Sequence, residues 1–392
     1  MAVSAVPKVV VPKSPASTLR RNPTAAWRHL DVVLLGCVVA IACLGALMVY
    51  SATRGPTPPY SLTFFEKQAL YVAIGLVVLA ITTLVDYRVF RDWSLFLYFG
   101  ACGLLALVVS PFGSTSKGAQ SWFQIGSFQL QPSEIAKVAL IIALAAVASQ
   151  FRGEIDLRRL CVLLVLAGLP LGLIMLQPDL GTALVMTAIT AGILLVAGAK
   201  GRHLAVLVLV MLLGAGLALH SNVLKEYQTA RLTSFLAENV SEKNDPALAQ
   251  AKYNVDQSKT AIGAGGPLGE GLFKGSQTRL GNVPEQHTDF IFTAVGEQLG
   301  FAGAGTLLAL FCIIIWRIWR TAQLARDEFG MLVCVGVLAM LMAQIFENVG
   351  MTMGIMPVTG IPLPFVSYGG SSTIAEFAVI GLVLNVHMRR FS

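Results

Sequence analysis

Residues 281–292 read Gly281-Asn282-Val283-Pro284-Glu285-Gln286-His287-Thr288-Asp289-Phe290-Ile291-Phe292. This stretch closes the longest polar segment of the chain and opens a long apolar run. The run is long enough to cross a membrane as a helix, which needs about 20 mostly apolar residues. Asp289 therefore stands at the edge of a predicted membrane helix, where an ionisable group is costly unless it has a partner or a function. This position makes Asp289 the first candidate for a chemical centre.

The composition of the chain indicates a membrane protein. Of its 392 residues, 55% are hydrophobic and only 12% are charged, whereas soluble globular proteins carry about 25% charged residues. Sparse charge spread over many apolar runs is typical of a polytopic membrane protein. The formal net charge of +7 does not indicate nucleic-acid binding, because the basic residues of membrane proteins collect in cytoplasmic loops.

Apolar segments of spanning length recur along the chain. They predict an all-α polytopic membrane protein with about ten transmembrane helices. The run at 289–316 is longer than a span needs, so we expect it to tilt or to begin outside the hydrocarbon. The predicted helices cover roughly residues 31–50, 68–86, 92–111, 134–150, 158–176, 180–198, 203–220, 289–316, 330–356 and 372–388.

Basic residues set the predicted orientation. Five of them lie in residues 1–30, which we expect to be a disordered basic cytoplasmic tail, and most loops on that side are basic too. This bias places both termini in the cytoplasm. Segment 221–288 carries seven basic residues, but long loops translocate largely regardless of charge. We therefore predict one transmembrane domain over residues 31–390, with 221–288 as a large extracellular loop between helices seven and eight.

Polar motifs gather on one predicted face of the membrane. With the N-terminus inside, the even-numbered helices begin outside, and unusual polar residues stand at their starts. The Pro- and Gly-rich segment 357–370 lies on the same face. Because helix N-termini favour negative groups, the sequence predicts an outer-face site suited to phosphate.

Ser133, Glu134 and Lys137 begin one of these helices. We expect Ser133 to cap its N-terminus. Glu134 and Lys137 are three residues apart and share one helix face. Two interpretations stay open and can hold together. The two side chains neutralise each other so that Lys137 can be buried, or Lys137 faces an anionic substrate group while Glu134 orients it.

Other polar residues of the predicted spans have ordinary structural explanations. Asp179 follows a proline at a helix start, which is typical of capping, and this interpretation is favoured over a catalytic one. Gln344, Glu347 and Asn348 share a helix face, and we expect them to join helices by hydrogen bonds. We expect the same of Glu376.

The glycine-rich segment 257–271 permits close approach of another backbone and anion-binding nests. Its spacing matches neither a P-loop nor a dinucleotide-binding fingerprint, so a nucleotide site is not supported. A phosphate nest and a tight extracellular loop remain equal alternatives. Residues 223–239 are typical of a short amphipathic helix on the membrane surface.

Asp289 itself has three open roles. A helix N-terminus favours its ionised form, which could hold a divalent cation, act as a general base, or only cap the helix. Thr293 and Gly296 fall on the same predicted helix face and extend a small polar stripe toward a cavity. Glu285 and His287 are close in sequence, but one histidine beside acids is too little for a zinc site.

Five motifs occur in one order along the chain: Gly118–Gln120 with Trp122, Gln131–Lys137, Gln177–Ala183, Pro284–Phe292 and Pro362–Ser372. In this combination the chain resembles the SEDS proteins (shape, elongation, division and sporulation), which include RodA and FtsW, over roughly residues 31–390. The segments 257–263, 274–277 and 285–289 are more similar to RodA than to FtsW. One departure is Ser121, where the family usually has a basic residue, and Lys117 is the candidate substitute.

The resemblance implies a multi-pass protein of the bacterial plasma (inner) membrane. It implies a peptidoglycan glycosyltransferase that polymerises lipid II during cell-wall elongation, with Asp289 as the essential acid and Glu134 and Lys137 as further catalytic residues. It implies a class B penicillin-binding protein, a single-pass transpeptidase, as partner. Within or beside these motifs we expect substrate contacts from Lys117, Gln131, Ser133, Lys259, Gln286, His287, Thr288, Ser367 and Ser371.

These expectations combine into one mechanism. Asp289 takes the proton from the 4-hydroxyl of the acceptor N-acetylglucosamine as that oxygen attacks C1 of the donor N-acetylmuramic acid. Undecaprenyl pyrophosphate leaves, and inversion gives a β-1,4 bond. We expect Lys137 and a divalent cation, magnesium or manganese with Asp289 as a ligand, to stabilise the leaving group.

Three other functions stay open. A lipid II flippase also suits about ten helices with intramembrane charge, but a carrier places its site near the midplane between repeated halves. The polar motifs here gather on one face instead. A noncatalytic scaffold for the transpeptidase is disfavoured by the presence of Glu134, Lys137 and Asp289. A division polymerase of the FtsW type is the third alternative.

Overall fold

The computed structural model describes residues 29–55, 57–111, 113–116, 119–126, 128–151, 155–203, 205–206 and 246–391. Three expectations fall almost wholly outside these residues. They are the cytoplasmic tail 1–30, the seventh helix at 203–220, and the amphipathic helix at 223–239.

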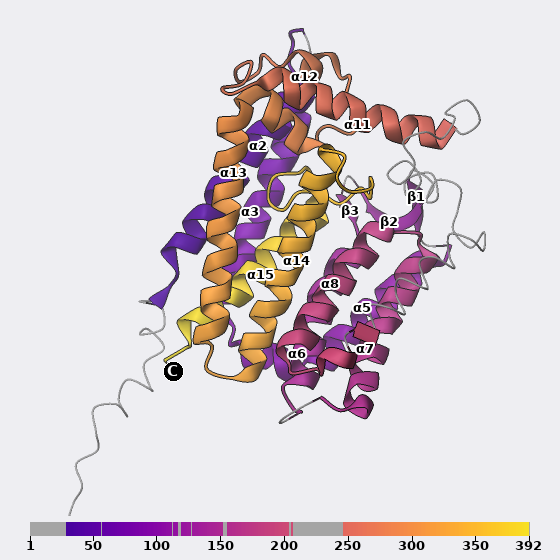
Figure 1. Ribbon diagram of the computed structural model, residues 1–392, viewed down its shortest axis with the longest axis vertical. Coiled ribbons are helices and arrows are strands. Elements are labelled where there is room, and N and C mark those ends of the chain that lie inside the picture. The colour runs from indigo at the N-terminus through magenta and orange to yellow at the C-terminus, as the bar shows by residue number, and fades with distance from the viewer. Residues whose placement is uncertain are drawn as a thin grey trace, which may run out of the picture.

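Long apolar helices dominate the described residues (Figure 1). Six are long and apolar enough to cross a membrane, and they fit the expected multi-pass membrane protein. The count of about ten helices stays a prediction. The six are α2 (Val32–Thr53), α3 (Thr63–Leu84), α7 (Leu157–Leu176), α13 (Ile291–Leu324), α14 (Glu328–Thr352) and α15 (Gly370–Met388). The shorter helices are α4 (Tyr87–Asp92), α5 (Ser94–Val109), α6 (Pro132–Ala148) and α8 (Leu180–Val196).

The expectation of an all-α fold is wrong between α5 and α6. A three-stranded antiparallel sheet stands there, formed in the order β1-β2-β3 by β1 (Ser114–Ser116), β2 (Ala119–Ile125) and β3 (Phe128–Leu130). Aromatic and β-branched residues favour the paired positions, and Gly126 turns the β2–β3 hairpin with φ of 62°. Strands this short show little of the period-two alternation of apolar and polar residues that predicts a strand. The sequence pattern therefore did not indicate a sheet between two long apolar runs.

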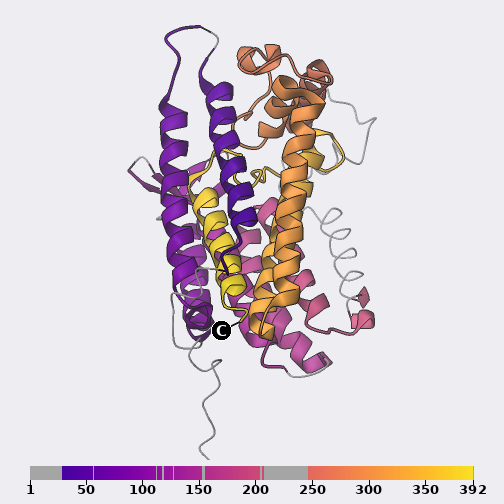
Figure 2. The ribbon, with the colours of Figure 1, turned by 90° about the vertical axis from the view of Figure 1, so that its left-hand side faces the viewer.

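Helix α15 lies at the centre of the bundle. In its most apolar 18 residues 89% are buried, against 22% in α13. Small residues let α3 come close: the Phe377 ring fills the space beside Gly75, and Gly381 packs against Leu79 and Thr82. Figure 2 shows α15 running between α3 and α13. A substitution in α15 therefore alters packing against several helices, because α15 contacts α3, α6, α13 and α14.

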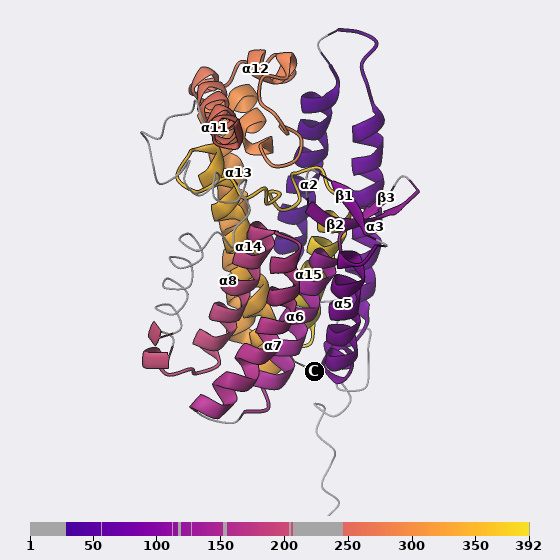
Figure 3. The ribbon, with the colours of Figure 1, turned by 90° about the vertical axis from the view of Figure 1, so that its right-hand side faces the viewer.

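Helix α13 is bent near its start. Gly300 has φ of 64° and ψ of −166°, which are not helical values. The helix begins at Ile291 and ends at Leu324, whereas the sequence predicted 289–316. The segment before Gly300 packs against α11 (Pro246–Gly265) and α12 (Ser276–Leu280), which lie across one end of the bundle (Figure 3). A tilt of this helix, or a start outside the hydrocarbon, stays a prediction.

Glycines permit direct backbone contact between α11 and α13. A Cβ on Gly265 would overlap the carbonyl of Gly296, and one on Gly300 would overlap the backbone amide of Gly269. The glycine-rich segment 257–271 is thus largely helical and serves close packing inside the protein. Residues 266–271 follow the helix as turns, with positive φ at Gly266, Gly269 and Gly271. The loop alternative therefore holds for this part alone, and the phosphate nest stays a prediction.

The two ends of the described chain lie together. The rings of His29 and Phe391 are 5.2 Å apart, and the Arg317 Nε donates to the Asp31 carboxylate at 2.7 Å. The C-terminus lies at the end of the bundle opposite α11 and α12 (Figure 1). This arrangement agrees with two termini on one side of the membrane, and which side they face stays a prediction.

Candidate active site

Asp289 lies in a turn, not at the head of a helix. Residues 284–290 form consecutive turns, and α13 begins two residues after Asp289. The amides of Thr288 and Phe290 both donate to the carbonyl of Glu285, at 3.1 and 3.2 Å. Glu285 takes φ of 54°, a left-handed conformation that cannot continue into a right-handed helix. The predicted helix start at Asp289 is therefore too early.

The carbonyls of the residues before Asp289 are held by segment 361–369. The main-chain oxygen of His287 accepts a hydrogen bond from the Tyr368 amide at 2.9 Å. The main-chain oxygen of Thr288 accepts one from the Ser367 hydroxyl at 2.6 Å. These contacts are made to the backbone of the turn, so they set its position.

Asn348 of α14 holds the next carbonyl. Its Nδ2 donates to the main-chain oxygen of Asp289 and to that of Ile361, each at 2.8 Å. Asn348 is fully buried. The prediction that it joins elements by hydrogen bonds is confirmed, and one of the elements that it joins is the Asp289 turn.

Gln68 of α3 supports the same segment from the other side. Its Nε2 donates to the Ser367 carbonyl at 3.2 Å, and its Oε1 accepts from the Gly369 amide at 3.4 Å. The Ser367 hydroxyl oxygen also accepts from the Leu363 amide at 2.8 Å. Sequence reasoning missed Gln68, which is fully buried. The available signal was a polar glutamine at the start of the predicted span 68–86.

A line of aromatic rings runs from the Asp289 turn to the sheet. His287 packs 5.0 Å from Phe64 and 5.8 Å from Tyr368. Tyr368 is 6.0 Å from Tyr71, which is 5.8 Å from Phe128 of β3. Burial, and then the neighbouring Tyr71, raises the pKa of Tyr368, so its hydroxyl stays protonated. Aromatic faces bordered by polar groups suit the binding of sugar rings.

Glu134 and Lys137 form the buried ion pair that their spacing predicted. The Lys137 ammonium lies 2.9 Å from each Glu134 oxygen, and both side chains are almost fully buried. The neutralising interpretation is thus confirmed, while contact of Lys137 with a substrate stays a prediction. Helix α15, which carries the buried acid Glu376, packs against α6.

Ser133 does not cap α6, so that expectation is wrong. The N-cap is Gln131, Pro132 occupies the first turn, and the buried Ser133 hydroxyl has no partner in the described part of the chain. The Ser371 hydroxyl donates to the Gln129 carbonyl and accepts from the Gln131 amide, both at 3.0 Å. Gln131 and Ser371 therefore join the starts of α6 and α15.

The start of α8 meets the same region. Asp179 caps it, accepting from the Thr182 amide at 2.9 Å and the Thr182 hydroxyl at 2.7 Å, so the capping interpretation is confirmed. A Cβ on Gly181 would lie 2.7 Å from Ile361 and 3.1 Å from the Thr359 carbonyl. Segment 357–370 thus contacts α3, the start of α8 and the Asp289 turn. These contacts bring the polar motifs together at one end, as predicted.

The remaining predicted basic contacts lie elsewhere. Lys259 of α11 is exposed, and its ammonium packs against Gly354 just beyond the end of α14, where helix carbonyls favour a cation. Its neighbour Ser258 is buried, bonds to the Thr293 hydroxyl and donates to the Thr352 carbonyl at 2.9 Å. Thr293 therefore faces α11 and not a cavity, which corrects the predicted stripe. Lys117 lies outside the described residues.

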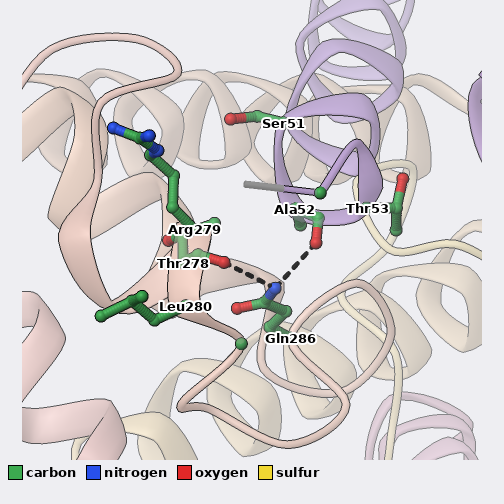
Figure 4. Close-up of a pocket in the computed structure, with 9 residues that line it drawn as sticks. Ser51, Ala52, Thr53, Thr278, Arg279, Leu280 and Gln286 are labelled. Atoms are coloured by element: carbon green, nitrogen blue, oxygen red, sulfur yellow. Dashed lines mark hydrogen bonds between the residues drawn. The ribbon is translucent and has the colours of Figure 1, made fainter. Parts of the chain in front are cut away.

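Gln286 lines a small pocket at the end of α2 (Figure 4). Its Nε2 donates to the carbonyls of Ala52 and Thr278, at 2.7 and 3.0 Å. The pocket has a volume of about 260 Å³ and extends to Ser51 and Arg279. Gln286 thus ties α2 to α12 beside the Asp289 turn.

Glu297 of α13 was missed by sequence reasoning. It is fully buried and accepts from the amides of Gln277 and Thr278, at 2.6 and 3.0 Å, and from the Thr278 hydroxyl. It therefore holds the N-terminus of α12. Its neighbour Gln298 accepts from the Ser51 hydroxyl at 2.6 Å. An acid inside a predicted span was the signal that could have found Glu297.

A divalent cation at Asp289 would depend on the substrate. No cluster of three His, Cys, Asp or Glu side chains suited to a metal exists within the described ranges. Magnesium is often held by one or two carboxylates plus substrate phosphates. The Asp289 carboxylate fits that pattern, whereas a site built from protein ligands alone does not fit.

Comparison with known proteins decides the family. A family model described as "Cell cycle protein", FTSW_RODA_SPOVE, matches residues 31–391. The chain belongs to the FtsW/RodA/SpoVE family. Within this family it is 35% identical to the peptidoglycan glycosyltransferase MrdB of Escherichia coli (strain K12) over 363 residues, which cover 92% of this chain and 94% of MrdB. It is 34% identical to the probable peptidoglycan glycosyltransferase FtsW of Geobacter sp. (strain M18) over 365 residues, 92% and 97% of the two chains.

Solved structures of this family share the fold. A chain described under "Structural coordination of polymerization and crosslinking by a peptidoglycan synthase complex" matches with a TM-score of 0.77 and 32% identity, covering 92% of this chain and 98% of that one. The rod shape determining protein RodA of Thermus thermophilus matches with a TM-score of 0.69 and 29% identity, covering 93% and 99%. The resemblance drawn from five motifs is therefore confirmed.

Proposed function

We propose that this protein is a peptidoglycan glycosyltransferase that polymerises lipid II into β-1,4-linked glycan strands. The observation that carries the proposal is the anchoring of the Asp289 turn. Tyr368, Ser367 and Asn348 donate to the three successive carbonyls of residues 287–289, so the backbone that carries Asp289 is held from two other segments of the chain. The names of the MrdB and FtsW relatives support the same activity.

In the proposed reaction Asp289 is the general base. Its carboxylate takes the proton of the acceptor 4-hydroxyl as the oxygen forms a bond to C1 of the donor sugar. The bond from C1 to the phosphate oxygen breaks on the opposite face, undecaprenyl pyrophosphate departs with the electron pair, and the anomeric centre inverts. A positioned base contributes about 10²–10⁴ in rate.

A bound magnesium or manganese ion would supply positive charge that stabilises the departing pyrophosphate. The Asp289 carboxylate is the protein ligand proposed for it, together with substrate phosphate oxygens. The rings of His287, Phe64 and Tyr368 are proposed to flank the sugars. Gln131, Ser133, Gln286, Thr288, Lys259, Ser367, Ser371 and Lys117 remain proposed contacts.

We propose that the protein crosses the bacterial plasma membrane with about ten helices. Both termini are then cytoplasmic, and residues 221–288 form an extracellular loop. The synthase-complex structure of a related chain supports a class B penicillin-binding protein as partner. Duty in elongation is proposed from the RodA-like segments, and rescue of cell shape rather than of septation in depleted cells would test it.

The deciding experiment is incubation of the purified protein with labelled lipid II in liposomes. The proposal predicts glycan polymer, with magnesium or manganese and the transpeptidase added as separate arms. Translocated but unpolymerised lipid II would favour a flippase. Neither product, with the transpeptidase bound, would favour a scaffold.

A further inference from the structure

Glu376 is a buried acid in α15 that grips the polar segment before that helix. Its side chain is 2% exposed. Its Oε2 accepts a hydrogen bond from the Phe365 amide at 2.7 Å, while Oε1 accepts none from the described residues. An acid that is buried this deeply needs a partner to offset its lost hydration.

The residue that Glu376 holds has an unusual backbone. Phe365 takes φ of 62°, a left-handed conformation that a bulky residue adopts only when its surroundings enforce it. Its ring is buried against Phe377, at 5.5 Å between centroids. Its backbone packs against Gly45 of α2, where a Cβ would lie 2.6 Å from the Phe365 carbonyl oxygen. The ring, the packing and the Glu376 bond together enforce the turn.

The contacts of the Asp289 turn follow immediately in the chain. Two residues after Phe365, the Ser367 hydroxyl donates to the Thr288 carbonyl, and the next amide, of Tyr368, donates to His287. A shift at Phe365 would move both donors. Helix α15 also packs against α6, the helix that carries the Glu134–Lys137 pair.

We propose that Glu376 is a positioning residue: by accepting from Phe365 it sets segment 361–369, and through that segment the turn that carries Asp289. This inference rests on the proposed glycosyltransferase function and adds a residue that acts through the main chain. Residue 376 needs a side chain long enough to accept a hydrogen bond from the Phe365 amide. The charge of that side chain is secondary.

Two conservative variants separate the reach of the side chain from its charge. Glu376→Gln keeps an oxygen at the same distance, whereas Glu376→Asp keeps the charge and withdraws it by one methylene. The proposal predicts that Glu376→Gln keeps most of the wild-type kcat for lipid II polymerisation. Glu376→Asp should lose about 10–100-fold, the scale of a misplaced catalytic group, with KM nearly unchanged. The reverse order of the two variants would overturn it.

Hydrogen exchange gives a readout that does not depend on turnover. Amides 365–368 and 288–290 should exchange faster in Glu376→Asp than in Glu376→Gln. Asn385→Leu is the matched control, because Asn385 is a buried polar residue of α15 that donates to Thr82 at 2.7 Å toward the other end of the helix. It should lower stability and leave exchange at 288–290 and kcat unchanged.

The outcomes separate the two claims. If the wild-type protein makes no polymer, the proposed function fails, and exchange alone then judges Glu376. If the wild type polymerises and Glu376→Asp matches it in both kcat and exchange, only the positioning role is overturned.

Discussion

The Nδ2 of Asn348 in α14 donates to the main-chain oxygen of Asp289 at 2.8 Å, and the two residues are 59 positions apart in the chain. The same amide donates to Ile361. One buried side chain therefore fixes the position of the acidic turn relative to the segment that surrounds it. The conformation of the turn depends on tertiary contacts with residues distant in the chain, and the local sequence alone does not determine that conformation.

Replacing Asn348 by leucine should displace the acid. Two donors disappear and two carbonyls lose their partner, which costs about 1–3 kcal/mol for each unsatisfied group. We expect kcat for lipid II polymerisation to fall by about 10–100-fold because the base is misplaced. Thermal unfolding in detergent and steady-state polymerisation measure the two effects. Wild-type kcat in a folded Asn348→Leu protein would contradict the role.

The buried ion pair of α6 predicts a compensating pair of mutations. Lys137→Met alone leaves Glu134 charged and buried, and Glu134→Gln alone does the same to Lys137. Each should destabilise the protein by about 3–5 kcal/mol, whereas the double variant should recover much of that loss. Chemical denaturation would show this pattern.

Polymerisation by the same double variant tests the catalytic assignment. If Lys137 serves the departing pyrophosphate, the double variant is stable and still inactive. Recovery of activity together with stability would show that the pair has only a structural role.

Glu297 predicts a local defect at α12. Glu297→Ala removes the acceptor of the Gln277 and Thr278 amides, so residues 276–281 should exchange hydrogen faster and stability should fall by about 1–3 kcal/mol. Glu270→Gln is the control, since Glu270 accepts from Ser276 at the solvent-exposed side of α12. Equal hydrogen exchange at residues 276–281 in the two variants would contradict the role of Glu297 in holding the N-terminus of α12.

Metal removal separates a cation requirement from a purely protein-based mechanism. With EDTA, polymerisation should stop, and magnesium or manganese should restore it. Because the described residues supply no three-ligand cluster, a tight metal complex should form only when lipid II is present. Calorimetry of the cation with and without a pyrophosphate lipid measures this, and tight binding to the protein alone would contradict it.

The sequence was most informative where a residue pattern is local. The spacing of Glu134 and Lys137 predicted their ion pair, and the proline before Asp179 predicted a cap, because both follow from helix geometry. The gathering of polar motifs at one end also followed, since helices that alternate in direction place alternate starts together.

The features that sequence reasoning missed depend on contacts between distant residues. Nothing near Asp289 shows that its helix starts later, because Glu285 takes a left-handed conformation only within the packed turn. Gly300 bends α13 because Gly269 packs against it from another segment. Glu376 looked like a helix-joining residue, and its bond to Phe365 depends on a loop that no periodicity describes.

The central claim is that the Asp289 carboxylate removes the acceptor proton, and a matched pair of isosteric variants tests it. Asp289→Asn keeps shape and removes the base, while Asp179→Asn replaces one good N-cap by another. With purified protein and lipid II, the account predicts no polymer from Asp289→Asn at an unchanged melting temperature and wild-type polymerisation from Asp179→Asn. Glycan produced by Asp289→Asn at the wild-type rate would contradict it.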